Sequence, residues 1–497
     1  MASISNLGVG SGLDLNTLLT GITKAENAPL AAIQQQQKSY TSKLSAYGQL
    51  SSALEELQKA AAALALPALY QGVTATPTVP DVLTATALSG APAGTYAVDV
   101  KQLSQAQSLV AAGVASTTAV VGVGTVTIQF GKISGGTLDS ASGTYSSAAF
   151  TPDTTRTATS ITIDSSHNTL AGIRDAINGN AASGVTASIV NDGTSAPNRL
   201  VLTSTKTGET SSMKITVSGD TALSSLLAND PAGLPVAQKM QQTAVAQNTK
   251  LTVNGIAITN ATNVVKEAVQ GVTMTVAKVG LSSLKVQSDT ATVETAVSTF
   301  MTAYNKLQGT ASTLTAFDAT NKTGGMLLGD ATLRNIQVRV RAALTAVQAP
   351  DSSGLTTLSQ IGVSLQTDGT LAFDLKKDKI ISGAEKLKDA LDTKMSGVQK
   401  LFAGTSGPSG VGGYGRQMSV LLTGLTDSNG TLTSATKGLK SSLETLAMQY
   451  TATSERIDVT IARYKAQFTQ LDVMMSTMNQ TSTYLTQQFD ALNNSNK

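Results

Sequence analysis

Cysteine and tryptophan are absent from this chain of 497 residues, and histidine occurs once. Without cysteine the chain can form no disulfide, no thiolate nucleophile and no cysteine-ligated metal site. Charged residues make up 13% of the chain, about half the share usual in soluble domains. The net charge is +3, and aromatic residues make up 4%. Nucleic-acid binding normally needs a concentrated basic face with stacking rings, so the composition argues against nucleic acid as a partner.

The sequence also lacks two targeting features. No basic residue precedes Lys24, and no long apolar run follows the start, so a secretory signal peptide is not expected. If the protein leaves the cell, its route therefore retains the N-terminus. The uncharged stretch 109–128 has the length of a membrane span, but it contains three glycines and ends in the alternating pattern of a strand. We therefore predict β structure there and no membrane span.

Apolar residues at helical spacing predict helices near the N-terminus. One short helix precedes Pro29, and a longer one follows it and ends before Pro67. In the longer helix apolar residues recur every seven positions, which is typical of the contact positions of a coiled coil. The predicted N-terminal packing seam consists of Leu18, Ile22, Tyr40, Tyr47 and Leu54.

The C-terminal pattern is longer. Apolar residues recur every seven positions from Leu443 to Leu492, and neither Pro nor Gly occurs between Tyr450 and Lys497. A helix over these last residues would be about 70 Å long at about 1.5 Å per residue, and needs a partner helix from the N-terminus or from another copy. The predicted C-terminal seam consists of Leu443, Tyr450, Ile457, Ile461, Tyr464, Phe468, Leu471, Met475, Met478, Leu485 and Phe489.

Between these ends the sequence favours β structure. Alternating segments predict strands at 161–163, 185–190, 199–203 and 214–217, a short helix at 169–178, and a hairpin at 366–371. The segment 229–235 is predicted as the linker that leaves the outermost domain. The fold class expected is multidomain α+β, with a long helical coiled-coil stalk formed by the N- and C-terminal ends and nested, inserted antiparallel β-rich domains. The expected division is a terminal helical leg (1–40, 455–497), a helical core domain (41–77, 288–454), an inserted β domain (78–109, 246–287) and an outermost β-rich domain (110–245).

No motif predicts catalysis, a cofactor or a metal. Gly410, Gly412 and Gly415 match a dinucleotide fingerprint, but a flexible loop precedes them where that motif requires a strand. His167 lies near Asp164 and Ser165 between a strand and a helix, where such residues commonly form turns and caps. The acidic residues are dispersed without metal-ligand spacing. The protein is therefore not expected to be an enzyme.

Several short motifs, in order along nearly the whole chain, resemble the flagellar filament-capping proteins, which are the distal hook-associated proteins. The resemblance weakens in the central block, 110–245. The matching segments are 8–14, 18–19, 29–30, 94–98, 102–107, 253–256, 263–265, 271–273, 361–363, 368–371, 398–404 and the closing pairs Arg463-Tyr464, Gln467-Phe468, Met478-Asn479 and Tyr484-Leu485.

The resemblance implies a structural cap at the distal tip of the bacterial flagellar filament, outside the cell. It implies a homo-oligomer of about five or six copies, whose helical legs contact flagellin and whose β domains form a plate beneath which exported flagellin folds and inserts. Hook–filament junction proteins, a flagellar export chaperone and the type III export apparatus would be further partners. Two alternatives remain at this point: another flagellar axial protein, such as a hook–filament junction protein, and a surface adhesin acting through the outer β domain.

Overall fold

The computed structural model describes residues 12–375, 381–404 and 412–495. It divides the chain into two compact units: a helical unit, Met1–Tyr70 with Thr290–Lys497, and a β-rich unit, Gln71–Asp289. Both ends of the chain thus belong to one unit, and the β-rich unit is inserted between them. The predicted α+β class, with long helical ends around nested antiparallel sheets, is confirmed.

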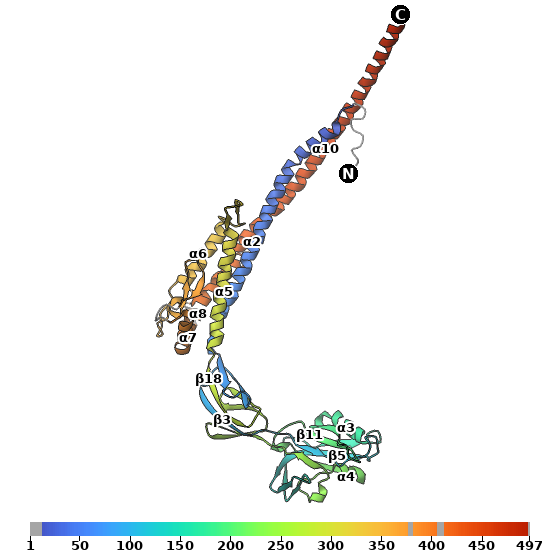
Figure 1. Cartoon of the computed structure of the whole chain (residues 1–497), viewed down its shortest axis with the longest axis vertical. Helices are drawn as coiled ribbons and strands as arrows, with labels where there is room; N and C mark the ends of the chain where they lie inside the picture. Colours follow the sequence, from blue (N-terminus) through green and yellow to red (C-terminus); the bar gives the residue numbers. More distant parts are fainter. Residues whose placement is uncertain (1–11, 376–380, 405–411, 496–497) are drawn as a thin grey trace. The chain divides into compact units, whose positions relative to one another are not determined.

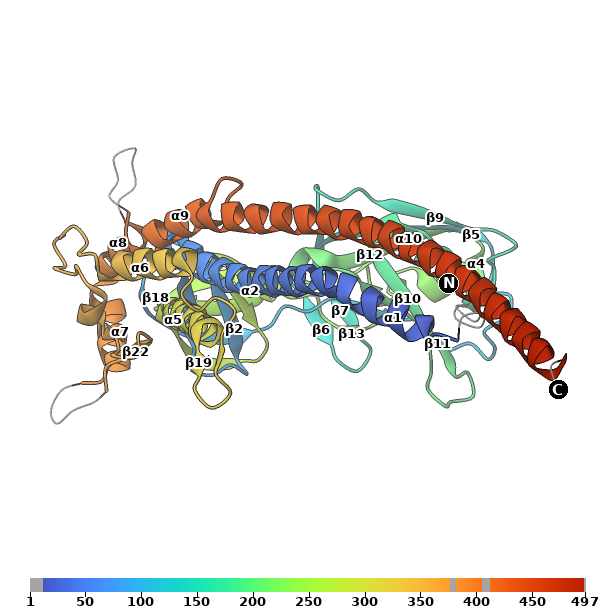
Figure 2. The ribbon, with the colours of Figure 1, turned by 90° about the horizontal axis from the view of Figure 1, so that it is seen from above.

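The helical unit is built around α2. This helix packs against α5, α9 and α10, and Figures 1 and 2 show α2 and α10 side by side over much of their lengths. Its core is one hydrophobic cluster that includes the fully buried Leu54, Phe300, Tyr304 and Phe402. The helices are α1 (Leu15–Glu26), α2 (Ala28–Leu64), α5 (Thr290–Thr315), α6 (Ala331–Thr345), α7 (Gly383–Thr393), α8 (Met395–Ala403), α9 (Tyr414–Thr426) and α10 (Thr431–Ser495).

Local chemistry sets where these helices begin. Asp14 caps α1 by accepting a hydrogen bond from the Thr17 amide, and Pro29 occupies the first turn of α2. Helix α10 begins 19 residues before Tyr450, after a turn in which the Gly430 amide donates to the Asp427 carbonyl. The whole seven-residue pattern, from Leu443 to Leu492, therefore lies within α10.

Two short hairpins complete the helical unit. Strands β19 (Phe317–Asp318) and β20 (Thr323–Gly324) pair with each other, and so do β21 (Val363–Leu365) and β22 (Leu371–Phe373). The second hairpin confirms the prediction at 366–371. Its turn includes Gly369 at a φ of +84°, a conformation that favours glycine.

The β-rich unit contains two hydrophobic clusters, each between antiparallel sheets. The first lies between a five-stranded sheet of order β1-β18-β3-β14-β15 and a three-stranded sheet of order β16-β17-β2. Its strands are β1 (Val73–Pro77), β2 (Leu83–Ala87), β3 (Gly94–Gln102), β14 (Thr249–Val253), β15 (Ile256–Asn260), β16 (Val264–Val269), β17 (Val272–Val276) and β18 (Gly280–Ser288).

The second cluster lies between sheets of order β10-β11-β4-β13 and β12-β5-β8, with β9 also paired to β5. Helices α3 and α4 contribute to it (Figure 1). The predicted strands and short helix in this region are confirmed, and 109–128 contains strand, not a membrane helix. The elements are β4 (Ser108–Val110), β5 (Gly124–Ser134), β6 (Thr137–Asp139), β7 (Thr144–Ser146), β8 (Ala149–Pro152), β9 (Thr159–Ile163), α3 (Leu170–Gly179), β10 (Val185–Asn191), β11 (Asn198–Ser204), β12 (Ser212–Gly219), α4 (Thr221–Leu227) and β13 (Gln241–Ala244).

The segment 229–235 is not the exit linker that the sequence predicted. Asn229 bridges to both Ile215 and Gln238, and the Gln238 side chain donates to the carbonyls of Gly233 and Tyr145. These bonds fold the segment back onto its own domain. The chain leaves that domain after β13, where Gln247 forms an isolated bridge with Gln105 in the incoming connection between β3 and β4.

Candidate packing surface on the terminal helices

The longest helix, α10, comprises 65 residues, which at about 1.5 Å per residue makes it close to 100 Å long. Within the described residues, no helix has the length and apolar character needed to cross a membrane. Neighbouring helices cover the apolar stripe of α10 to a different extent in three parts of the helix.

The first part of α10 packs against α2 and α9, and its Leu432 belongs to the core cluster of the helical unit. Leu446 and Ile457 are buried, and the predicted seam residues Leu443 and Tyr450 are half-buried. Gln34 of α2 donates a hydrogen bond of 3.2 Å to the Tyr450 hydroxyl. This bond joins residues 416 positions apart in the sequence, across the contact between α2 and α10.

The middle part of α10 packs against α1. Leu15 and Leu19 of α1 are buried, and four predicted seam residues of α10 are half-buried. The Tyr464 and Phe468 rings stack with their centroids 6.5 Å apart. The four α10 residues are Ile461, Tyr464, Phe468 and Met475.

The predicted N-terminal seam is divided in the same way. Tyr47 and Leu54 are buried in the core, whereas Ile22 and Tyr40 are half-buried and Leu18 is 51% exposed. The Tyr47 hydroxyl donates to Asp330 at 2.7 Å. Burial and this hydrogen bond raise the pKa of Tyr47 to about 12, so the hydroxyl stays protonated.

The distal part of α10 exposes its apolar side chains. Met478 is 59% exposed, Leu485 50% and Phe489 64%, and Leu471 is also exposed at 38%. These residues continue the seven-residue pattern whose earlier members pack against α1 and α2. Side chains of one apolar stripe are therefore mostly buried or half-buried beside α1 and α2 and exposed farther along α10. Exposed apolar stripes of this kind mark interaction sites in soluble proteins.

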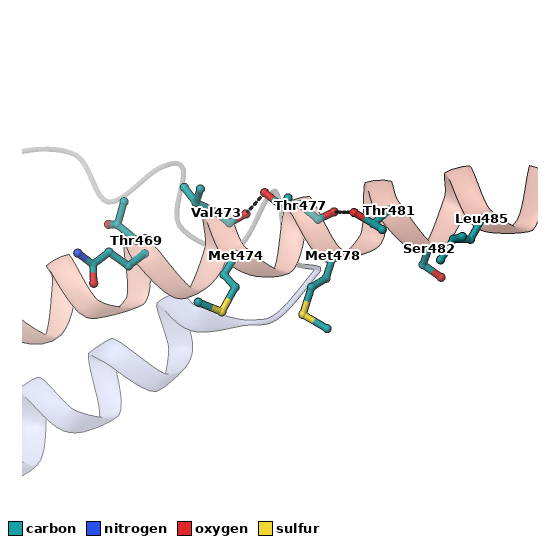
Figure 3. A pocket seen from close by; sticks show the side chains of 9 residues that line it. Thr469, Val473, Met474, Thr477, Met478, Thr481, Ser482 and Leu485 are labelled. Carbon is teal, nitrogen blue, oxygen red and sulfur yellow. Dashed lines mark hydrogen bonds between the residues drawn. The ribbon is translucent and has the colours of Figure 1, made fainter.

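Threonines make this distal face more apolar than its composition suggests. The Thr477 hydroxyl donates to the Val473 carbonyl at 2.9 Å, and the Thr481 hydroxyl donates to the Thr477 carbonyl at 2.9 Å (Figure 3). Because these hydroxyls are satisfied by the helix itself, their methyl groups face outward. Met474 and Met478 extend together from the side of the helix nearer α1 (Figure 3). The resulting groove is lined by Thr469, Gln470, Val473, Met474, Thr477, Met478, Thr481, Ser482 and Leu485.

The residues considered for catalysis have structural roles where they are described. His167 Nδ1 lies 3.0 Å from Asp164 Oδ1, in a turn where the Ser166 amide and hydroxyl donate to the same oxygen. Gly415 lets α9 approach α2, because a β-carbon there would lie 2.8 Å from the Ala61 carbonyl oxygen. Gly410 lies outside the described residues. Within them, no group of three or more His, Asp or Glu side chains could hold a metal ion.

The chain is similar to members of a known family. Family models match 11–107 (flagellar hook-associated protein 2, N-terminus), 246–480 (flagellar hook-associated protein 2, C-terminus) and 150–206 (flagellin hook IN motif). The chain is 39% identical to flagellar hook-associated protein 2 of Escherichia coli K12, with 100% of both chains covered. It is 37% identical to the protein of that name from Salmonella typhimurium, again with 100% of both covered.

A solved structure is similar too. The crystal structure of the D1-D2-D3 domains of the flagellar cap protein FliD from Escherichia coli aligns with a TM-score of 0.58 at 33% identity. The alignment covers 80% of this chain and 99% of that one. The similarity thus extends beyond the terminal helices to the inserted β domains.

Proposed function

Because this chain belongs to the flagellar hook-associated protein 2 family, we propose that it is a structural cap at the distal tip of a bacterial flagellar filament. Its place is extracellular, on the filament, and it promotes the folding and insertion of exported flagellin without making or breaking bonds. Since the family match covers the whole chain, neither the adhesin nor the hook–filament junction protein is favoured.

One observation carries the mechanism: the seam residues of α10 up to Met475 are buried or half-buried except Leu471, whereas Met478, Leu485 and Phe489 are all at least 50% exposed. Helices associate through such stripes, and an exposed stripe on a leg can bind a neighbouring helix reversibly. Both predicted seams would then serve leg packing, with Ile461, Tyr464 and Phe468 holding the leg together and Met478, Leu485 and Phe489 meeting flagellin.

The domain division assigns separate roles in this proposal. The terminal legs, 1–40 with 455–497, contact flagellin, and the helical core, predicted as 41–77 with 288–454, supports them. Within that range Val73–Pro77 is strand β1, which pairs with β18 in the β-rich unit, so the helical part ends at Tyr70. The β domains, 78–109 with 246–287 and 110–245, form the plate. About five or six copies make the cap, which sits above the hook–filament junction proteins when growth begins. A cytosolic export chaperone and the type III export apparatus deliver each copy.

The test is the fate of flagellin in cells that lack this gene. We expect such cells to export flagellin and lose it to the medium as monomer. Adding the purified chain should restore filaments. Normal filament growth without the gene would disprove capping and leave another axial role as the leading explanation.

A further inference from the structure

A pocket between α5 and α6 gathers side chains that donate hydrogen bonds. It has a volume of about 210 Å³ and is lined by Gln308, Arg334, Gln337, Val338 and Arg341. All but the valine carry N–H donors, and two of them are cationic. Such a pocket suits an anion, above all a carboxylate, which two guanidinium groups can bind with charge-assisted hydrogen bonds.

The donors of this pocket are positioned by packing. Gln308 Nε2 donates to the hydroxyl of the fully buried Tyr304 at 3.0 Å. Arg341 interacts with the same hydroxyl, and a β-carbon at Gly369 would lie 3.0 Å from Arg341 Nη2. Arg341 therefore lies between a buried tyrosine and a hairpin turn. Less side-chain entropy is lost on binding when donors are held in this way.

The pocket concentrates positive charge. Helix α6 contains three arginines and no acidic residue, although the whole chain has a net charge of only +3. Among the ion pairs of the described residues, none involves Arg334 or Arg341. Arg334 and Arg341 are seven residues apart, so they lie on the same side of α6 about 10.5 Å from each other along the axis.

Helix α7 carries a stripe of the opposite charge with the same spacing. Glu385, Asp389 and Asp392 are exposed and lie at positions i, i+4 and i+7, so they also share one side over about 10.5 Å. Glu385 additionally completes the capping box of α7 with Ser382. The acidic stripe thus matches the length of the stripe from Arg334 to Arg341.

The lysines of α7 lie beside the acidic stripe. Lys386 pairs with Asp374 at 3.1 Å, which neutralises it within its own chain. Lys388 is exposed beside the acidic stripe, so it would lie at the edge of any contact that the stripe makes and could pair with an acidic residue of the partner there. The three carboxylates therefore form the side of α7 that is complementary to α6.

We infer that the α5–α6 pocket of one copy binds the acidic stripe of α7 of a second copy. Within one chain α6 packs on α9 and α7 packs on α5, so the two stripes are separate patches of the helical unit. A contact between two different patches of identical copies is heterologous. Repeating it from copy to copy builds either a closed ring or an open chain of copies. The inference rests on the proposed function, since a cap is an assembly of copies, and it names one contact that would join them.

Charge reversal on the full-length chain tests this contact. One variant is Arg334→Glu with Arg341→Glu, and the other is Asp389→Arg with Asp392→Arg. Sedimentation velocity at about 50 mM salt should show self-association of each variant weakened by about tenfold or more relative to wild type, because like charges now face each other. An equimolar mixture of the two variants should recover the association, because each restores the charge that the other lacks.

Arg341→Glu is also made alone, and Arg339→Glu is its matched control, since Arg339 lies on α6 but does not line the pocket. The inference is overturned if the mixture fails to recover association, if the aspartate variant associates like wild type, or if Arg339→Glu weakens association as much as Arg341→Glu. Flagellin assembly is scored separately with the wild-type chain. If the wild-type chain promotes flagellin assembly but the charge reversals do not change self-association, the proposed contact is wrong and the proposed cap function stands. If the mixture recovers self-association but the wild-type chain does not promote flagellin assembly, the contact stands and the cap function is wrong.

Discussion

The hydroxyl of Tyr47 donates a hydrogen bond of 2.7 Å to Asp330, and the other carboxylate oxygen of Asp330 accepts the Leu333 amide at the start of α6. One carboxylate therefore joins the long helix α2 to the N-terminus of α6. A charged group near a helix N-terminus also interacts favourably with the helix dipole. We expect Tyr47→Phe to lower the free energy of unfolding by about 1–3 kcal/mol, since it removes a hydrogen bond to a charged acceptor.

Thermal and urea denaturation of the full chain would measure this loss. Tyr40→Phe is the matched control, because Tyr40 lies one heptad earlier on the same helix and is only half-buried. Equal losses in the two variants would show that the bond to Asp330 contributes nothing of its own.

Two glycines on neighbouring helices should respond oppositely to alanine. A β-carbon at Gly415 would meet the Ala61 carbonyl oxygen at 2.8 Å, whereas one at Gly438 of α10 would meet nothing within 4 Å. We expect Gly415→Ala to destabilise the helical unit by about 1–3 kcal/mol through overpacking. Gly438→Ala should stabilise it by about 0.5–1 kcal/mol through helix propensity. Melting temperatures that shift in the same direction would contradict the close approach of α9 and α2.

Acid should weaken the β-rich unit through Asp192. The Arg199 side chain donates to its carboxylate, and the Thr194 amide and hydroxyl donate at 3.0 and 2.8 Å. These bonds lower the pKa of Asp192 from its ordinary 3.8 to about 2 in the folded state. A lowered folded-state pKa gives stability that is present above about pH 4 and is lost as the pH falls toward 2.

Calorimetry of the full chain between pH 5 and pH 2 would measure this loss. Asp192→Asn should start with a lower melting temperature at pH 5 and lose less of it on acidification. Asp81→Asn, at an exposed residue of the same unit, controls for the change in net charge. If Asp192→Asn and wild type lose the same melting temperature, the pairing with Arg199 and Thr194 does not stabilise the fold.

Hydrogen exchange should divide α10 into a protected and an unprotected part. Ile457 is buried, whereas Phe489 is 64% exposed, and a helix without tertiary packing is marginal in water. In the free protein we expect slow exchange around Leu446 and Ile457 and fast exchange beyond Met478. Slow exchange from Tyr450 through Leu492 in a monomer would contradict this division.

The seven-residue period was sufficient to predict that α10 is a long helix with one apolar side. It could not predict where the covering helix ends, because Phe468 and Phe489 belong to the same repeat and differ only in what lies beside them. The linker was wrongly predicted at 229–235 for a similar reason, because contacts between distant residues decide the structure there. Prolines and glycine are typical of a linker, but Gln238 holds this segment on its domain by bonding Tyr145, 93 residues earlier in the chain. Alternating apolar residues predicted the strands well, because one face of each is buried.

The most direct test of the central claim uses the exposed part of the stripe on α10. Met478→Ser, Leu485→Ser and Phe489→Ser are combined in one variant, and Ile457→Ala is the matched control in the covered part. The triple variant should keep the wild-type melting temperature, because its side chains are exposed, whereas Ile457→Ala should cost about 2–4 kcal/mol of stability. Expressed in cells that lack the gene, the folded triple variant should leave flagellin in the medium as monomer. Filaments of normal length with the triple variant would contradict the account, since the exposed stripe would then not be the surface that retains flagellin at the tip.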